Sequence, residues 1–343
     1  MLMPRLIKTI LLAGQILLAA SSSATEVSVH DPVMAKEGAS YYVYSTGPGI
    51  TFYSSQNMLD WKPEGRIFKD EPDWARNAAP AFNGHVWAPD VQFHRGQYYL
   101  YYSVSGFGKN ASAIGVATSP TLNPRAANYH WQDQGMVLQS VPGRDDWNAI
   151  DPNIVEDAQG QAWMVFGSFW SGIKLVRLND SWTHLQEPQE WHAVASRATA
   201  ASGADGEAGP QEIEAPFIFR KNNYYYLFVS WGLCCRGPNS TYRLMIGRSA
   251  SVTGPYLDKE GRDMAKGGGS LVVEGTAEWK ALGHNSAYSM DGKDYLVMHA
   301  YETADNYLQK LKIMEMHWDR DLWPVVDVQD LNRYKSRLLP ESP

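Results

Sequence analysis

The sequence repeats one short pattern five times, and this repeat restricts the possible folds more than any other feature. Each copy has a turn at a proline or serine, followed by a strand-like stretch rich in tyrosine, valine or leucine. The aligned residues lie at intervals of 57, 63, 64 and 70. They are Pro32, Pro89, Pro152, Pro216 and Ser286. A regular period of this length predicts a fold built from equivalent units.

Each repeat contains about four short strands, separated by turns rich in Gly, Pro, Asn and Asp. No long apolar stretch with a 3.6-residue period lies between them, which argues against strand–helix–strand units. Units of four strands arranged radially form a propeller. We therefore predict an all-β fold, a five-bladed β-propeller with about four antiparallel strands per blade. Tyrosine pairs such as Tyr98-Tyr99 are interpreted as packing between blades rather than as sugar-binding surfaces.

Residues 1–24 have the pattern of a secretory signal peptide. Arg5 and Lys8 give a basic start, an apolar run follows, and small residues lead to a predicted cleavage site near Ala24. We therefore expect a secreted or periplasmic protein in which residues 25–343 form a single catalytic propeller. No later stretch is apolar enough for a membrane helix. Residues 198–209, rich in Ala and Gly, are predicted to be a mobile insertion without chemistry of its own.

The composition narrows the range of partners. The formal charge of the 343 residues is −7, and without the basic leader it becomes more negative, which disfavours nucleic acid as a partner. The only cysteines are Cys234 and Cys235. Because there are only two, we interpret them as excluding a disulfide framework and a cysteine zinc site. The pair is either a strained vicinal disulfide or two buried thiols. A monomer is expected.

Acidic residues recur near the aligned position of the repeat. Asp31, Asp151 and Glu214 lie at or within one residue of it, and His284 takes this place in the last copy. In a propeller these side chains would converge at one mouth of the central channel. Because carboxylates are costly to bury unpaired, such convergence needs a reason. Either water or a cation holds the blades together there, or two carboxyl groups act on a glycosidic bond.

The same stretches resemble the arabinan endo-1,5-α-L-arabinosidases of glycoside hydrolase family 43, which are five-bladed propellers. The resemblance runs from about Val29 to Glu302 and rests on eight motifs, at residues 30–32, 87–91, 112–115, 148–152, 167–173, 214–216, 234–237 and 283–286. The Cys-Cys-Arg-Gly and Ser-Phe-Trp-Ser-Gly motifs favour the endo-acting branch over the xylosidases of the family.

The resemblance implies a role for each acid. Asp31 would be the general base that activates water, and Glu214 the general acid that protonates the leaving oxygen. Asp151 would orient Glu214 and tune its pKa, since a nearby negative charge raises the pKa of a carboxyl group. His284 would help to hold one structural calcium ion or a water cluster in the channel, with no organic cofactor. Glu212 is a rival acid, because a strand places it on the same face as Glu214, but the Glu-Ala-Pro motif favours Glu214.

Substrate contacts are expected around these acids. Trp87, Phe107 and Trp170 are candidate walls against sugar rings, although packing between blades also explains them. The backbone of residues 148–150 is expected at the channel mouth. The predicted substrate-binding set is Asp31, Trp87, Phe107, Gly115, Asn148, Ala149, Ile150, Asp151, Ser168, Phe169 and Trp170.

These observations predict an inverting glycoside hydrolase that cleaves internal α-1,5-L-arabinofuranosidic bonds, with arabinan or arabino-oligosaccharides as substrate. An exo-acting arabinofuranosidase or a β-xylosidase on the same fold is the alternative within the enzyme class. A non-catalytic glycan-binding propeller is the alternative of another class. Such a binding module needs no carboxylates on the axis, so the three acids count against it.

Overall fold

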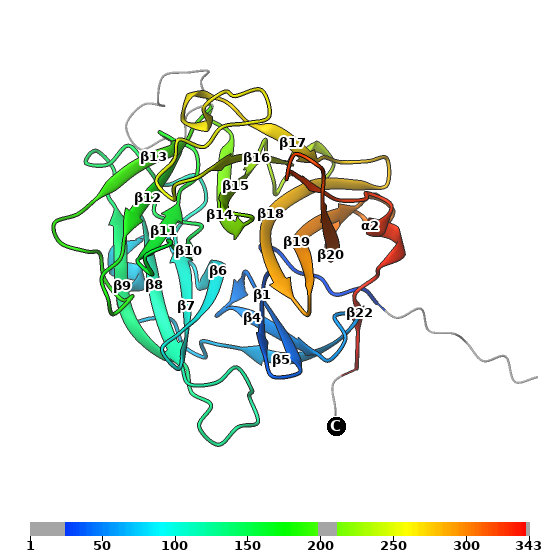
Figure 1. The fold of residues 1–343 in the computed structure, drawn as a ribbon. Coiled ribbons are helices and arrows are strands. Elements are labelled where there is room, and N and C mark those ends of the chain that lie inside the picture. The colour runs from blue at the N-terminus through cyan, green and yellow to red at the C-terminus, as the bar shows by residue number, and fades with distance from the viewer. Residues whose placement is uncertain (1–24, 198–210, 341–343) are drawn as a thin grey trace, which may run out of the picture.

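The structure, a computed structural model, describes residues 25–197 and 211–340. The predicted leader and the predicted insertion at residues 198–209 lie outside the described residues. Five sheets stand around a common centre (Figure 1), which confirms the predicted five-bladed all-β propeller. Within the described residues, no helix is both long and apolar enough to cross a membrane.

The blades follow one another along the chain, and each begins with its innermost strand. Blade 1 contains β1 (Val33–Glu37), β2 (Ser40–Ser45), β4 (Thr51–Ser55) and β5 (Asp60–Arg66). Blade 2 contains β6 (His85–His94), β7 (Gln97–Val104), β8 (Ser112–Ser119) and β9 (Gln132–Ser140). Blade 3 contains β10 (Asn153–Glu156), β11 (Ala162–Phe166), β12 (Ile173–Arg177) and β13 (Trp191–Ala195).

Blade 4 contains β14 (Ile213–Lys221), β15 (Tyr224–Trp231), β16 (Arg243–Ser249) and β17 (Ser270–Val273). Blade 5 contains β18 (Trp279–Met290), β19 (Lys293–Glu302), β20 (Leu308–Trp318) and β21 (Pro324–Val325). The short β3 (Gly47–Pro48) joins blade 2, and β22 (Arg337–Leu338) joins blade 1. Short helical turns connect the strands: α1 (Ala75–Ala78), α2 (Asp330–Arg333), η1 (Gly237–Asn239), η2 (Met264–Lys266) and η3 (Thr303–Asp305).

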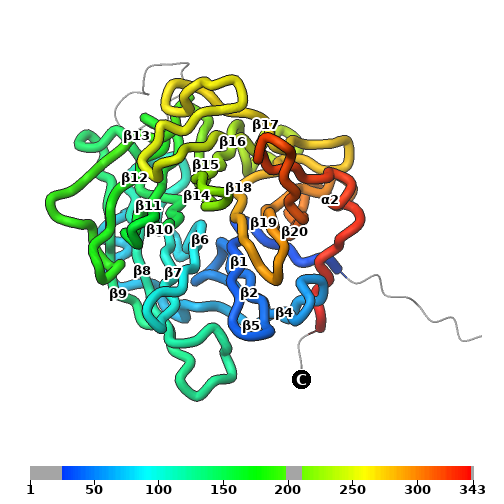
Figure 2. Tube along the Cα trace, in the orientation of Figure 1, coloured from blue at the N-terminus to red at the C-terminus, as the bar shows by residue number. Residues whose placement is uncertain are grey.

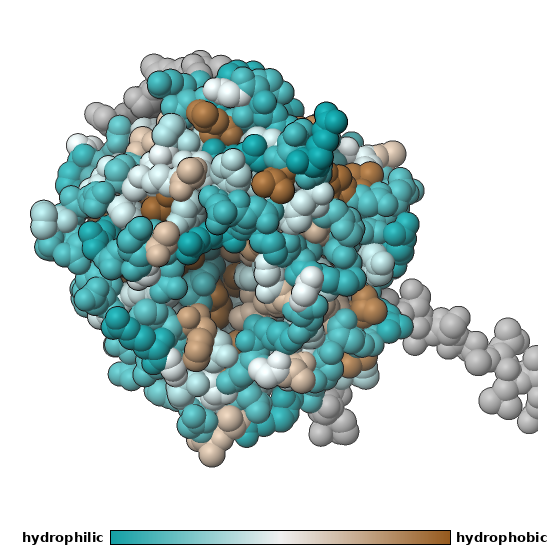
Figure 3. Space-filling view, in the orientation of Figure 1, coloured by the Kyte–Doolittle hydropathy of each residue, from teal (hydrophilic) through white to brown (hydrophobic). Residues whose placement is uncertain are grey.

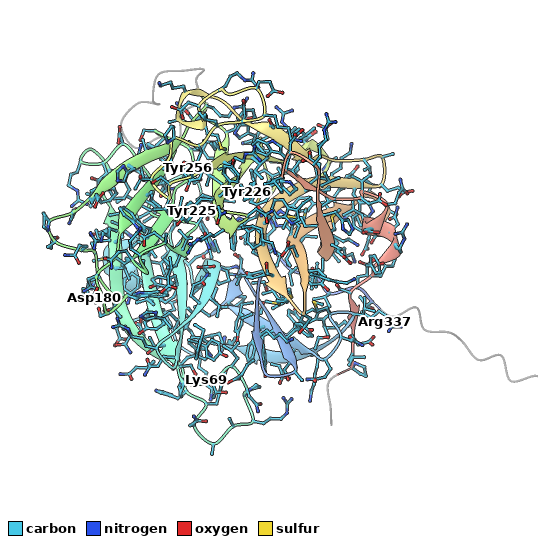
Figure 4. The ribbon with its side chains drawn as sticks, in the orientation of Figure 1. Lys69, Asp180, Tyr225, Tyr226, Tyr256 and Arg337 are labelled. Carbon is cyan, nitrogen blue, oxygen red and sulfur yellow. The ribbon has the colours of Figure 1, made fainter. Side chains whose placement is uncertain are left out.

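Hydrophobic clusters between neighbouring blades hold the ring together. Because successive side chains on a strand point to opposite faces, each blade contributes to the cluster on either side of it. On β15, Tyr225 packs with residues of blade 3 and Tyr226 with residues of blade 5. Both tyrosines lie inside the disc in Figure 4. The interpretation of the tyrosine pairs as packing between blades is therefore confirmed.

A shared backbone turn lies at the start of the five blades, close to the axis. One residue per blade has a positive φ there: Asp31 (52°), Ala88 (45°), Asp151 (59°), Ala215 (54°) and His284 (48°). The left-handed region is costly for residues other than glycine, and such strain is common at functional sites. In blade 5 the residue that follows the turn is Asn285, so the sequence alignment on Ser286 was wrong by one position.

The two ends of the described chain meet between blades 1 and 5 (Figure 2). The Val27 N–H donates to the Ser336 carbonyl at 2.8 Å, and the Leu311 N–H donates to the Val27 carbonyl at 2.9 Å. Next to them β22 pairs in parallel with β5, and Arg337 of this strand lies at the rim in Figure 4. At the centre of the disc, where the inner strands converge, the surface is hollowed (Figure 3).

Candidate active site

One cavity of about 370 Å³ collects the three predicted acids. Asp31 comes from the start of blade 1, Asp151 from the start of blade 3, and Glu214 from β14 of blade 4. Asp31 and Asp151 are buried, while Glu214 is partly exposed. The repeat therefore places acids that are far apart in sequence around one space near the axis.

Asp31 sits among histidines. Its Oδ1 lies 2.7 Å from His30 Nδ1 and 2.9 Å from His284 Nδ1. The Thr46 hydroxyl donates to its other oxygen at 2.5 Å. Burial on its own raises the pKa of Asp31, but the charges of His284 and His30 outweigh it and hold this pKa well below its usual range. Asp31 is therefore ionised, as a general base must be.

The histidines differ in charge. Burial lowers the pKa of His30, but the Asp31 carboxylate outweighs it and raises that pKa to about 10. The pKa of His284 is also raised, because Asp31 and Asp151 outweigh its burial. Burial and the nearby His30 instead hold the pKa of His299 well below its usual range. The neutral His299 accepts the backbone N–H of Asp31 on Nδ1 at 3.1 Å.

Glu214 is held at both oxygens. The Ser168 hydroxyl donates to Oε2 at 2.6 Å, and the Tyr242 hydroxyl donates to Oε1. Burial raises the pKa of Glu214, and these two hydrogen bonds only partly oppose the shift. The environment of Glu214 therefore favours the protonated form, which a general acid requires.

Asp151 lies beside the acid and contacts its backbone. Its Oδ2 accepts the N–H of Ala215, the residue after Glu214, at 3.1 Å. Its own N–H donates to the Ser103 hydroxyl at 3.1 Å. Burial raises the pKa of Asp151 to about 8, and the charges of Glu214 and Asp31 add to this although His284 opposes it. Asp151 is thus hydrogen-bonded to the backbone of the segment that carries Glu214.

The rival acid Glu212 points elsewhere. It does not line the cavity, and its carboxylate lies 3.7 Å from Arg197 Nη1 with the side chain 37% exposed. Strand spacing placed it on the same face as Glu214. The structure differs from this prediction because Glu212 lies just before β14, which begins at Ile213, so the alternation of a strand does not yet apply to it.

Most predicted substrate contacts line the same cavity. These residues are Trp87, Phe107, Asn148, Ile150, Ser168, Phe169 and Trp170. Phe107 is 75% exposed, whereas Trp170 is only 5% exposed. Phe169 and Trp170 both adopt a positive φ, which turns the loop before β12 at this point. Phe107 therefore presents an exposed ring at the cavity, whereas the buried Trp170 forms part of its wall.

The remaining two predicted contacts, Gly115 and Ala149, are not among the residues that line the cavity. A Cβ on Gly115 would lie 2.4 Å from Trp74 and 2.7 Å from Tyr102, so this glycine permits aromatic packing within blade 2. Ala149 is fully buried in the cluster between blades 2 and 3. The neighbours of Ala149, Asn148 and Ile150, line the cavity, whereas no residue of the 112–115 motif does.

Tyr242 is the main cavity residue that the sequence did not indicate. It precedes β16, outside the repeated turn, and only the folded chain brings it to Glu214. His30 belongs to the His-Asp-Pro motif at residues 30–32, and its position directly before Asp31 is the signal that could have placed it in the cavity. Cys234 and Cys235 also line the cavity as free thiols, and the expectation of buried thiols was wrong, because Cys234 is only partly buried and Cys235 is exposed.

The donor set near Asp31 decides which metal fits. The largely buried group of His30, Asp31 and His299 could hold a metal ion, since its donor atoms lie within 4.8 Å of one another. It offers two imidazoles and one carboxylate. Calcium prefers six to eight oxygen ligands, whereas imidazole suits zinc and related metals. These residues do not fit a calcium ion bound directly by the protein.

A carboxyl group with a lowered pKa, in one cavity with two carboxyl groups whose pKa values are raised, is the arrangement of hydrolases that use acid–base catalysis, and here it lies near the axis of a propeller. Comparison with known families narrows this class. Residues 24–324 match the model of glycosyl hydrolases family 43, and the chain belongs to this family.

Individual relatives cover nearly the whole chain. The extracellular exo-α-(1→5)-L-arabinofuranosidase ArbA of Cellvibrio japonicus is 59% identical over 92% of this chain and 91% of its own. The extracellular endo-α-(1→5)-L-arabinanase 1 of Bacillus subtilis is 40% identical over 89% of this chain and 90% of its own. The structure of Cellvibrio cellulosa α-L-arabinanase in complex with arabinohexaose matches with a TM-score of 0.90 and 59% identity, over 92% of this chain and all of that one.

Proposed function

We propose that this protein hydrolyses the α-1,5 bonds of arabinan and arabino-oligosaccharides by direct attack of water. The observation that carries this proposal is the single cavity in which Asp31 is held ionised while the pKa values of Asp151 and Glu214 are raised. Two carboxyl groups in opposite protonation states are what glycoside hydrolysis needs. The names of the relatives supply the sugar.

The proposed division of labour follows from the contacts. Asp31, kept ionised by His284 and His30, takes a proton from the attacking water. Glu214, held by Ser168 and Tyr242, gives its proton to the leaving sugar oxygen. Asp151 fixes the backbone at Ala215 and so the direction in which Glu214 points. For an inverting reaction, the carboxyl groups of base and acid should be roughly 6.5–9.5 Å apart, and a spacing near 5 Å would instead indicate a retaining mechanism.

We further propose that substrate binds along the aromatic wall of the cavity. Phe107, exposed at this wall, offers its ring to one sugar, while the buried Trp170 limits the depth of the site. Asn148 and Ile150 adjoin Asp151 and contribute contacts at the mouth. Apolar sugar faces stack well on such rings, because the ring buries area without losing much conformational freedom.

The mode of cleavage is better described as exo than as endo. Two motifs had favoured the endo branch, but the 59% identical relative is an exo-acting arabinofuranosidase and the endo-arabinanase is only 40% identical. We therefore favour release of short products from one chain end, with endo cleavage as the second candidate. A time course on linear arabinan tests this choice. A single short product from the first minutes supports exo action, and a ladder of early oligomers supports endo action.

The same assay separates the other two hypotheses. A β-xylosidase should release xylose from xylo-oligosaccharides and leave arabinan intact. A non-catalytic glycan-binding propeller should retain arabinan without forming reducing ends. Loss of arabinan hydrolysis in Glu214→Ala, with an unchanged melting temperature, links the activity to this cavity.

The predicted calcium ion near His284 stays a prediction. Because the nearby protein donors are rich in nitrogen, such an ion would need water for most of its ligands. Metal analysis after dialysis and a thermal melt with and without chelator test it. One retained equivalent and a lower melting temperature with chelator are the expected results for a structural ion.

We also propose that residues 25–343 act as a single catalytic domain and that the protein is a monomer outside the cytoplasm. Two relatives are named as extracellular, which supports export. The acidic composition supports a neutral polysaccharide rather than nucleic acid as partner. Mass determination of the exported protein tests cleavage near Ala24, and light scattering tests the monomer.

A further inference from the structure

Two free cysteines and His30 meet on the wall of the cavity, and the proposed hydrolytic reaction uses neither of the two thiols. The Sγ atoms of Cys234 and Cys235 and one ring nitrogen of His30 all lie within 4.8 Å of one another. The Sγ of Cys235 is 3.7 Å from His30 Nε2. The sequence had been interpreted as excluding a cysteine zinc site, because only two cysteines are present. The folded chain adds a histidine that is more than 200 residues away in the sequence.

The spacing of these atoms suits a tetrahedral metal ion. Zinc binds cysteine sulfur at about 2.3 Å and histidine nitrogen at about 2.0–2.1 Å, so two ligands of one zinc lie roughly 3.5–4 Å apart. The observed Sγ to Nε2 distance of 3.7 Å falls in this range. Two thiols and one imidazole form a soft donor set, which selects zinc and similar thiophilic cations over calcium or magnesium.

His30 is oriented as a metal ligand from its other side. Its Nδ1 lies 2.7 Å from the Asp31 carboxylate, and its ring stacks on His299 with centroids 4.1 Å apart. A carboxylate that holds one ring nitrogen of a histidine while the other nitrogen binds metal is a recurrent arrangement in zinc proteins. His30 Nε2 also lies 2.8 Å from the Tyr301 hydroxyl, and a bound metal would replace this hydrogen bond.

The cysteine loop is fixed as well. Cys235 has a φ of 64° and its N–H donates to the Tyr301 hydroxyl at 3.1 Å. At the two ends of the loop, the Leu233 N–H donates to the Thr241 hydroxyl at 3.0 Å, and the Arg236 N–H donates to the Ser240 hydroxyl at 3.0 Å. Ligands held in this way lose little freedom when a metal binds.

A disulfide is the competing fate of the two thiols. The Cα atoms of adjacent residues are about 3.8 Å apart across a trans peptide bond, which is shorter than the usual span of roughly 4.4–6.8 Å in disulfides. Bridging Cys234 to Cys235 is therefore strained, and both sulfurs are free in the structure. The reduced pair remains available to a metal.

We propose that His30, Cys234 and Cys235 form a binding site for one thiophilic divalent cation of the zinc class, with the fourth coordination position open to the cavity. Because all three residues line the cavity that holds the acids, a bound cation occupies space next to the sugar. It also engages the histidine that faces Asp31. Occupation of this site therefore inhibits hydrolysis reversibly. The binding claim stands without the proposed function, and only the inhibition rests on it.

The test uses the whole reduced protein, with free thiols counted beforehand, and cobalt(II) as a probe for zinc. We expect one equivalent of cobalt to give a thiolate-to-cobalt charge-transfer band that zinc then abolishes. Cys235→Ser should weaken zinc binding at least about tenfold, the lower end of what the loss even of an outer partner costs at metal sites. Cys234→Ser is the second single variant, in case the first fails to fold, and the double variant should show no such band.

His192→Asn is the matched control, since His192 is a partly exposed histidine paired with Glu190 on β13 and its loss should leave the band unchanged. Absence of cobalt uptake by the reduced protein overturns the proposal. Zinc affinity that survives in the Cys234→Ser/Cys235→Ser variant also overturns it, because the ion then binds at His30, Asp31 and His299 instead. Binding without inhibition of arabinan hydrolysis refutes the inhibitory role and leaves the site intact.

Discussion

Tyr242→Phe should move the basic limb of the pH–rate profile on arabinan to higher pH. The Tyr242 hydroxyl donates to Glu214 Oε1, and this hydrogen bond stabilises the ionised carboxylate. Without it Glu214 holds its proton more tightly, so the acid remains protonated up to a higher pH. Activity that depends on the protonated acid is lost as pH rises through its pKa, and this loss would therefore come later in the variant.

The size of the shift in the basic limb depends on the hydrogen bonds that Glu214 keeps in the variant. A hydrogen bond to a charged group contributes about 1.5–3 kcal/mol, and roughly 1.4 kcal/mol corresponds to one pKa unit. Ser168 still donates to Oε2 at 2.6 Å and can compensate in part. We therefore expect the lower end of this range, a displacement of about one pH unit.

The assay is kcat/KM across pH for wild type and variant, on linear arabinan and on an aryl arabino-oligosaccharide. The displaced limb should be pronounced on arabinan and weak on the aryl substrate, since a phenolate leaves without a proton. Tyr256→Phe is the control, because the Tyr256 hydroxyl is buried and donates to the Val252 carbonyl at 2.6 Å outside the cavity. A basic limb that stays in place, or moves to lower pH, in Tyr242→Phe refutes the assignment of this tyrosine as a donor to the acid.

Three further changes test other parts of the structure. Glu214→Ala should lose about 10² to 10⁴ in kcat on arabinan but much less on the aryl substrate, whereas Asp31→Ala should lose activity on both; equal losses of the two variants on the aryl substrate contradict these roles. Phe107→Ala should raise KM for arabinan by about two- to tenfold with little change in kcat, as loss of an aromatic contact of about 0.5–1.5 kcal/mol implies; an unchanged KM removes Phe107 from the binding site. Lys312→Ala should lower the free energy of unfolding by about 3 kcal/mol in a denaturant titration, the lower end of the cost of breaking a buried ion pair, because the buried Glu26 carboxylate then keeps only the more exposed Lys335 as its partner. The exposed Lys293→Ala is its control at about 1 kcal/mol or less, and similar values for the two lysine variants contradict the argument.

The repeat in the sequence predicted the blades and the convergence of the acids. Both depend on the regular spacing of equivalent residues along the chain, which can be read from the sequence. Its precise alignment in blade 5 was not predictable from the prolines, since the shared feature is the positive φ at Asp31, Asp151 and His284 rather than the residue type that follows. A backbone conformation of this kind leaves no fixed signature in the sequence. The structure therefore corrected the position in blade 5 by one residue.

Motif membership was a weaker guide to individual contacts. Gly115 belongs to a motif of the family, yet it makes room for Trp74 and Tyr102 instead of facing the cavity. Tyr242 lies in no repeated position and becomes visible only when the loop before β16 folds over Glu214. Sequence patterns predict where strands lie and how they repeat along the chain. The direction of a side chain in a loop depends instead on tertiary packing, which the patterns do not contain.

The closure of the ring between blades 1 and 5 has a consequence for the timing of activity. Asp31 lies at the start of blade 1, but His284, which contacts its carboxylate, and His299, which accepts its backbone N–H, belong to blade 5. These partners are about 250 residues apart and meet only when Val27 pairs with Ser336 and Leu311. The surroundings of Asp31 are therefore completed late, after nearly all of the chain has been synthesised and the first blade has docked on the last. A nascent or truncated chain can contain four correctly folded blades and still be inactive, so catalytic turnover itself reports that the ring has closed.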